Sequence, residues 1–157
     1  MSDLLQIFLT AALTLIGGTL LFIFGELARV LVIVPLQKYK EHVEVIRDRL
    51  DFYSNRVTNF FSEEPDDEEW ALIRQISSEF RSGATQLSSR YVGISLRGLL
   101  IRLKVIPTTE KLGEAYKSLI FLSNNIPRHG RRDTDSKHNP IMMNHDAIEK
   151  AKSALNP

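Results

Sequence analysis

An uncharged apolar run over residues 4–24 limits the fold of this chain more than any other feature. A helix rises about 1.5 Å per residue, so the run matches the roughly 30 Å hydrocarbon core of a bilayer. We therefore expect residues 4–34 to form a transmembrane helix with an interfacial extension. Residues 1–3 are then a short N-terminus on the far side of the membrane.

The same run differs from a cleaved secretory signal, which needs a basic start, a shorter apolar core and a small-residue cleavage site. Only Met1, Ser2 and Asp3 precede it, and residues 30–34 prolong its apolar character, which favours an uncleaved anchor. Basic side chains follow the span closely and none precedes it, which predicts a cytoplasmic C-terminal side in the plasma (inner) membrane. These basic residues are Arg29, Lys38, Lys40, Arg47 and Arg49.

Small or weakly polar residues recur at spacings near one helical turn inside the apolar segment. They are Thr10, Thr14, Gly17, Gly18 and Gly25. Such a stripe lets helices pack closely, although Gly and Thr are also common in membrane helices without that role. Glu26 and Arg29 share one helical face and are predicted to pair at the cytoplasmic interface, with an intramembrane ion path as the alternative.

About 120 of the 157 residues follow Pro35, which is an ordinary size for one domain. The absence of cysteine excludes disulfides, thiolate zinc sites and thiol nucleophiles. The fold class predicted is all-α, with an antiparallel helical bundle over residues 35–126 whose first helix is long. Pro35 is expected either to kink the junction with the membrane helix or to begin a new helix.

Alternating three- and four-residue steps mark a long amphipathic helix with a coiled-coil seam after Pro35. The seam is formed by Tyr39, Val43, Ile46, Leu50, Tyr53, Val57 and Phe60. We interpret Val45, Phe52 and Phe61 as widening this apolar stripe. A wider stripe favours packing within the chain, and pairing between copies in a homo-oligomer is the alternative.

A second helix is predicted to begin near Pro65, because the acidic residues 66–69 suit the positive end of a helix dipole. A third is capped by Thr108 or Thr109 and ends near Pro127. Between them, a short helix within residues 94–106 carries three basic residues, Arg97, Arg102 and Lys104. These either contact lipid headgroups or are exposed cations of a core element, and the second interpretation is favoured.

The end of the chain is predicted to be a polar basic loop over residues 127–145 and a short helix within residues 146–157. The loop has no interleaved aromatic residues and no recognition-helix pattern, which argues against nucleic-acid binding.

Three short segments resemble recurring parts of small single-pass bacterial membrane proteins that have a cytoplasmic helical domain. They are VPLQKY at residues 34–39, LDFYSN at 50–55 and LIFLSN at 119–124. The similarity covers residues 30–126 and ends before the basic tail. It implies a bacterial plasma-membrane location and a helical domain, and it supplies no catalytic or binding residue.

No arrangement of residues indicates a reaction, a cofactor or a metal. The four histidines lack the spacing of zinc pairs and are interpreted as surface residues: His42, His129, His138 and His145. Ser88 and Ser89 have no evident His and Asp companions.

The sequence favours a non-enzymatic interaction or scaffold module with three kinds of partner: the bilayer, an unidentified protein and further copies of the chain. Two alternatives remain. One is an oligomeric, channel-like effector built on the transmembrane helix. The other, more remote, is a metal-assisted hydrolase using the histidine-containing tail.

Overall fold

The computed structural model describes residues 2–58, 65–126 and 140–157, and the elements in these ranges are all helices. This confirms the all-α prediction for the described part of the chain. Phe60 and Phe61, and residues 127–139 of the predicted basic loop, lie outside it. The elements are α1 (Ser2–Ala28), η1 (Arg29–Ile33), α2 (Val34–Thr58), α3 (Asp67–Val92), α4 (Arg97–Arg102), α5 (Thr109–Asn125) and α6 (Pro140–Ala154).

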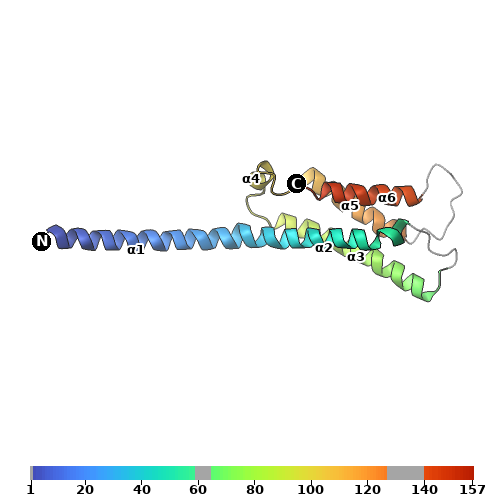
Figure 1. The fold of residues 1–157 in the computed structure, drawn as a ribbon, viewed down its shortest axis with the longest axis horizontal. Helices are drawn as coiled ribbons and strands as arrows, with labels where there is room; N and C mark the ends of the chain where they lie inside the picture. Colours follow the sequence, from blue (N-terminus) through green and yellow to red (C-terminus); the bar gives the residue numbers. More distant parts are fainter. Residues whose placement is uncertain (1, 59–64, 127–139) are drawn as a thin grey trace.

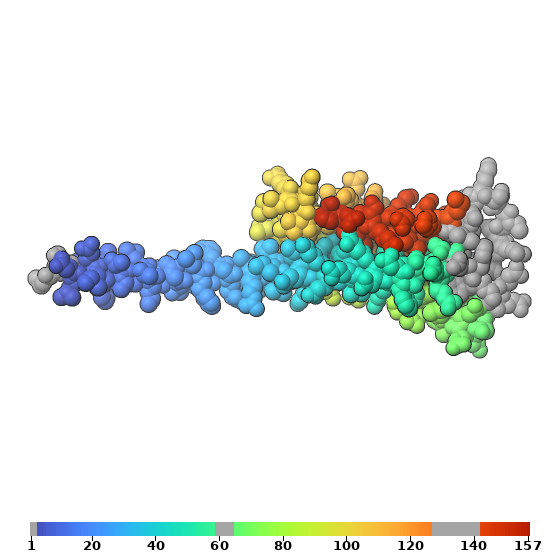
Figure 2. All heavy atoms as spheres, in the orientation of Figure 1, coloured from blue at the N-terminus to red at the C-terminus, as the bar shows by residue number. Residues whose placement is uncertain are grey.

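A single long rod runs through α1, η1 and α2, and the other helices gather only along its α2 half (Figure 1). Neighbouring helices alternate in direction: α2 and α5 run away from α1, whereas α3 and α6 run back toward it. We call α2 to α6 the helical domain. Figure 2 shows α1 projecting from this domain with no other described segment beside it.

The junction between α1 and α2 passes Pro35 without a break. The turn before the proline is π-helical, and the Val34 N–H donates to the Arg29 carbonyl, five residues back. A proline cannot donate to the carbonyl four residues before it, and its ring crowds that carbonyl. The wider π turn accommodates the proline, so the helix neither kinks sharply nor begins anew there.

The core of the helical domain lies between α2, α3, α5 and α6. The six described seam residues are all buried, with exposed fractions from 0 to 7%. They face Ile76, Phe80 and Leu87 of α3, and Leu119 and Leu122 of α5 belong to the same cluster. The seam of α2 therefore packs within its own chain in this structure.

Val45 and Phe52 do not widen the seam, contrary to our interpretation of the sequence. Their exposed fractions are 42% and 77%, and Phe52 makes an edge contact with Tyr53 at 5.0 Å between ring centroids. The reason is geometric: α2 packs on α3 and α6, which cover only the narrow face along the seam.

Local capping places the starts of α3 and α5 close to where the sequence suggests. The Asp66 side chain accepts from the Glu69 N–H at 2.8 Å, and Thr108, rather than Thr109, caps α5 by accepting from the Lys111 N–H. The last helix begins at Pro140, whereas the sequence suggested a start at Asp146.

Candidate membrane interface and partner groove

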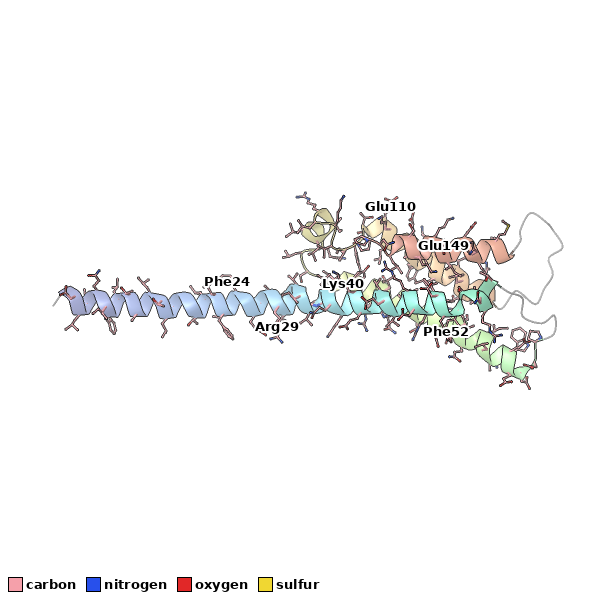
Figure 3. All side chains as sticks on the ribbon, viewed as in Figure 1. Phe24, Arg29, Lys40, Phe52, Glu110 and Glu149 are labelled. Carbon is pink, nitrogen blue, oxygen red and sulfur yellow. The ribbon has the colours of Figure 1, made fainter. Side chains whose placement is uncertain are left out.

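The continuous helix Asp3–Thr58 is the one helix in the described ranges that is long and apolar enough to cross a bilayer. Its most apolar window has no residue buried inside the protein. The Leu, Ile and Phe side chains of α1 have exposed fractions between 46% and 76%. Figure 3 shows side chains such as Phe24 pointing outward from the free part of the rod.

The predicted stripe of small residues lies open along α1. The Thr10 and Thr14 hydroxyls donate to the carbonyls of Gln6 and Thr10 at 2.8 Å, so each satisfies its polar group within the helix. These threonines line a shallow surface hollow with Ala11 and their neighbours. A Cβ atom at Gly17, Gly18 or Gly25 would meet nothing within 4 Å.

Glu26 and Arg29 form the predicted ion pair. The Arg29 Nη1 atom lies 3.3 Å from the Glu26 Oε2 atom, and the side chains are 66% and 48% exposed. An exposed pair one turn apart contributes little to folding stability. Pairing does lower the cost of bringing both groups close to lipid.

His42 is a buried residue of the α2–α3 contact, which corrects our interpretation of the four histidines as surface residues. Its Nε2 atom lies 3.1 Å from the Gly83 carbonyl oxygen of α3. Burial lowers the pKa of His42, and the charges of Arg90 and Arg49 act in the same direction, although the bond to Gly83 opposes them. His42 follows Tyr39 by three residues, a spacing that could have placed it beside the seam.

Tyr39 begins the seam at the end of the domain nearest α1. Its ring meets that of Tyr91 edge to face at 5.7 Å between centroids, and the Tyr91 hydroxyl donates to the Pro107 carbonyl at 2.9 Å. Burial first, and the neighbouring Tyr91 second, raise the pKa of the Tyr39 hydroxyl above its usual value. These aromatic contacts tie α2, α3 and the segment before α5 together.

The segment around α4 carries the three cations predicted either to contact lipid or to be exposed. Arg102 and Lys104 are exposed. Arg97 is exposed as well, and its guanidinium lies over the Tyr91 ring at 5.8 Å from the centroid. Leu100 is buried, whereas most leucines of the segment face outward. The structure thus brings the cations and the leucines to one end of the domain.

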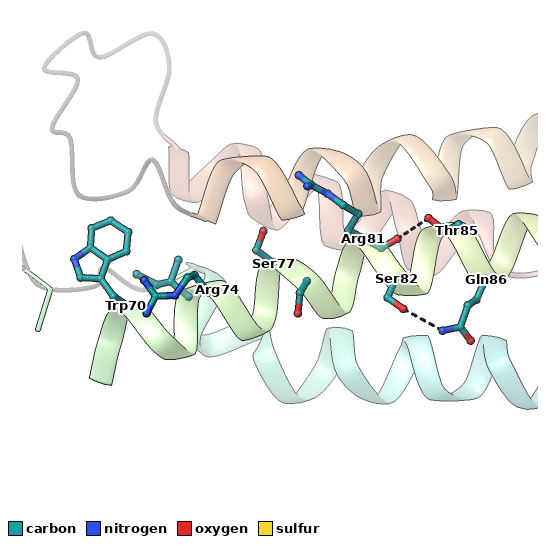
Figure 4. A pocket seen from close by; sticks show the side chains of 9 residues that line it. Trp70, Arg74, Ser77, Arg81, Ser82, Thr85 and Gln86 are labelled. Carbon is teal, nitrogen blue, oxygen red and sulfur yellow. Dashed lines mark hydrogen bonds between the residues drawn. The ribbon is translucent and has the colours of Figure 1, made fainter. Parts of the chain in front are cut away.

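A groove along α3 is a feature that the sequence did not reveal (Figure 4). It has a volume of about 580 Å³ and is lined by residues one helical turn apart: Trp70, Ile73, Arg74, Ser77, Ser78, Arg81, Ser82, Thr85 and Gln86. Arg81 donates to the Asn124 side chain of α5 at 2.7 Å, and Ser77 donates to the Ser123 carbonyl. These bonds fix one rim, and the Gln86 amide nitrogen donates to the Ser82 hydroxyl at 3.0 Å along α3.

Asn144 is a second side chain whose role in the fold the sequence did not reveal. It is fully buried, and its amide nitrogen donates to the Val57 carbonyl at 3.0 Å, so it holds α6 against the end of α2. Within the described residues, no group of three or more His, Asp or Glu side chains could hold a metal ion.

Comparison of the chain with protein-family models, curated proteins and solved structures gave no match.

Proposed function

We propose that this chain is a membrane-anchored, non-enzymatic interaction module that acts as a scaffold at the cytoplasmic face of a bacterial plasma membrane. The observation that carries the proposal is the free, apolar α1, whose side chains are exposed on every face. Exposed apolar surface of this extent marks a membrane or protein contact.

The energetics favour lipid over water for α1. Each Leu, Ile or Phe near the centre of a membrane helix favours insertion by about 0.3–0.6 kcal/mol. More than a dozen such residues are exposed along α1. Together they contribute at most roughly 4–8 kcal/mol, because residues away from the helix centre contribute less.

The distribution of charge supports an orientation with the helical domain in the cytoplasm. The first cations after the span are Arg29, Lys38 and Lys40, and all lie on the side of the domain. Positively charged residues close to a span are retained in the cytoplasm.

The groove on α3 is the surface that we assign to a protein partner. Ser78, Ser82 and Thr85 are small and follow one another at about one helical turn, so a second helix can approach α3 closely there. Arg74 and Gln86 provide polar groups beside them. Anchoring confines the groove to the membrane surface, which raises the effective concentration of partners that share that membrane.

The orientation can be tested by labelling single cysteines, because the chain has none of its own. We expect a membrane-impermeant maleimide to label Asp3→Cys on intact bacterial cells. Lys117→Cys, on the exposed surface of α5, should react only after the cells are opened. Labelling of Lys117→Cys on intact cells, or release of the chain by alkaline extraction, would contradict the proposal.

The partner groove can be tested with a photo-reactive amino acid in the full chain. Placed at Ser82, it should form a discrete protein adduct in native membranes, whereas the same group at the exposed Glu114 of α5 should not. Equal adducts at the two positions, or none at either, would count against an interaction role for this groove.

A second candidate function is an oligomeric, channel-like assembly, and the open stripe around Gly17 and Gly18 favours it. A channel requires that ions leak from vesicles that contain the chain. Leakage that disappears in a Gly17→Leu, Gly18→Leu variant would support the channel, and vesicles that do not leak with the unchanged chain would exclude it.

A further inference from the structure

The segment around α4 exposes an unusual amount of apolar surface for so short an element. The exposed fractions are 61% for Val92, 63% for Leu96, 53% for Leu99 and 62% for Leu103. Only Leu100 of the α4 helix is buried in the core. Clustered exposed apolar side chains of this kind mark a surface that contacts a partner or a membrane.

The backbone is strained on either side of α4. Leu96 and Lys104 have φ values of 57° and 54°, and they are the non-glycine residues with positive φ in the described part of the chain. Residues other than glycine rarely adopt this left-handed backbone conformation, and strain of this kind persists only where the surroundings impose it. Between the two strained residues, Leu100 is buried and its carbonyl accepts from the Val105 N–H at 2.9 Å, which anchors the segment on the domain.

The position of α4 matches the anchor. Figures 1 and 2 show α4 at the end of the helical domain from which α1 emerges. The contacts of Arg97 with Tyr91, and of Tyr91 with Tyr39 at the start of α2, fix it there. Among the described segments of the domain, α4 is therefore well placed to meet a bilayer crossed by α1.

The length of the apolar stretch supplies a way to bring α4 onto the lipid. Val30, Leu31 and Ile33 are still about half exposed beyond the Glu26–Arg29 pair. From Leu4 to Ile33 the helix covers about 45 Å, against a hydrocarbon core of roughly 30 Å. A span that is too long tilts, and a tilt toward α4 lowers that segment onto the headgroups.

The charge around the leucines fits an anionic leaflet. Arg97, Arg102 and Lys104 alternate with the leucines, and no Asp or Glu occurs between residues 94 and 106. Basic residues beside a membrane surface are attracted to acidic lipids, and leucines that flank them enter the boundary between headgroups and acyl chains.

We propose that α4 and its flanking residues form a second contact with the membrane, separate from α1. In this contact Leu96, Leu99 and Leu103 insert into the cytoplasmic leaflet, while Arg102 and Lys104 bind anionic headgroups. The inference rests on the proposed anchoring by α1 and deepens it. In this arrangement the helical domain lies against the bilayer, and α1 is not its only contact with lipid.

The test uses the full chain in vesicles, with an environment-sensitive fluorophore on one introduced cysteine. The probe position is Leu103→Cys, and the control is Phe52→Cys, which is more exposed than Leu103 and lies in α2, farther from α1. In vesicles that contain acidic lipid, we expect the Leu103 probe to shift to shorter wavelength. Lipids with a nitroxide near the headgroup should quench it at least twofold more than the Phe52 probe.

Charge variants test the role of the cations. In acidic vesicles, Arg102→Glu with Lys104→Glu should reduce quenching of the Leu103 probe to the level of the Phe52 probe. The control, Lys117→Glu with Lys150→Glu, changes exposed lysines of α5 and α6 and should have no effect.

A third probe at Leu13→Cys separates this inference from the anchoring on which it rests. If a nitroxide deep in the bilayer quenches the Leu13 probe but the Leu103 probe stays in water, the α4 contact is refuted and the anchor stands. If the Leu13 probe is not quenched, both fail. A Leu103 probe that shifts with protein density, without quenching by lipid, would assign the leucines to a second copy of the chain and overturn the proposal.

Discussion

Replacing Leu13 and Ile16 together by lysine should release the chain from membranes and leave the helical domain intact. Their exposed fractions are 61% and 55%, so neither side chain packs on the domain. Both lie near the middle of the run over residues 4–24. The perturbation therefore acts on transfer into lipid and not on the packed core.

The size of the effect follows from insertion energetics. Leu or Ile at the centre of a membrane helix contributes about −0.3 to −0.6 kcal/mol, and Lys costs about 2.5–3.5 kcal/mol. Each replacement therefore costs roughly 3–4 kcal/mol, and the pair costs roughly 6–8 kcal/mol. That change lowers the membrane-bound to free ratio by about 10⁴-fold or more, which cancels the insertion energy worked out above for α1.

Flotation of the full chain with liposomes measures this ratio, and circular dichroism reports the helical domain. The matched control replaces Phe52 and Met142 by lysine. These two side chains are 77% and 68% exposed but lie on the helical domain. The wild type and this control should float, while the Leu13→Lys, Ile16→Lys variant stays at the bottom with its domain helices retained. If the Leu13→Lys, Ile16→Lys variant floats with the lipid, or if the control variant fails to float to the same extent, the assignment of α1 as the anchor is refuted.

Three further predictions concern single features. Leucine at Gly17 and Gly18 fills the open stripe, so any dimer that crosslinks through α1 in detergent should be lost while flotation is unchanged; persistent dimers would place the contact elsewhere. Asn144→Ala leaves the buried Val57 carbonyl without that donor and should lower the free energy of unfolding by about 1–3 kcal/mol in a urea titration; a change within error would mean that the bond is not needed. Burial lowers the pKa of His42 in the folded chain, so stability is complete above the ordinary value of 6.5 and falls as the pH drops toward the lowered value. His42→Gln should flatten the dependence of the unfolding midpoint on pH between pH 7.5 and pH 5, and a parallel slope would assign that dependence to other groups.

Features that depend on neighbouring residues could be predicted from the sequence. Asp66 and Thr108 cap helices through side-chain bonds to residues three positions ahead, so a short window contains both the donor and the acceptor. The apolar residues of the seam in α2 repeat at helical spacing, and this spacing predicted that they are buried. The pairing of Glu26 with Arg29 is equally local.

Features that depend on how the helices assemble could not be predicted. Asn144 bonds to a carbonyl 87 residues earlier in the chain, and nothing around it distinguishes it from a surface asparagine. The His42 bond to Gly83 spans 41 residues. The groove on α3 is lined by serine, threonine and arginine, which the sequence presents as an ordinary solvated face. Only the placement of α5 beside α3 fixes its rim.

The junction at Pro35 makes the anchor and the α4 contact parts of one mechanical unit. Because the helix runs through η1 into α2 without a break, the domain keeps a fixed direction relative to α1. A flexible linker would let the domain adopt any orientation, and the leucines of α4 would then meet lipid only by chance. With a continuous rod, the tilt demanded by the long apolar stretch also decides which face of the domain meets the headgroups. The same tilt sets how far the groove on α3 stands from the membrane surface, and hence which membrane-bound partners can reach it.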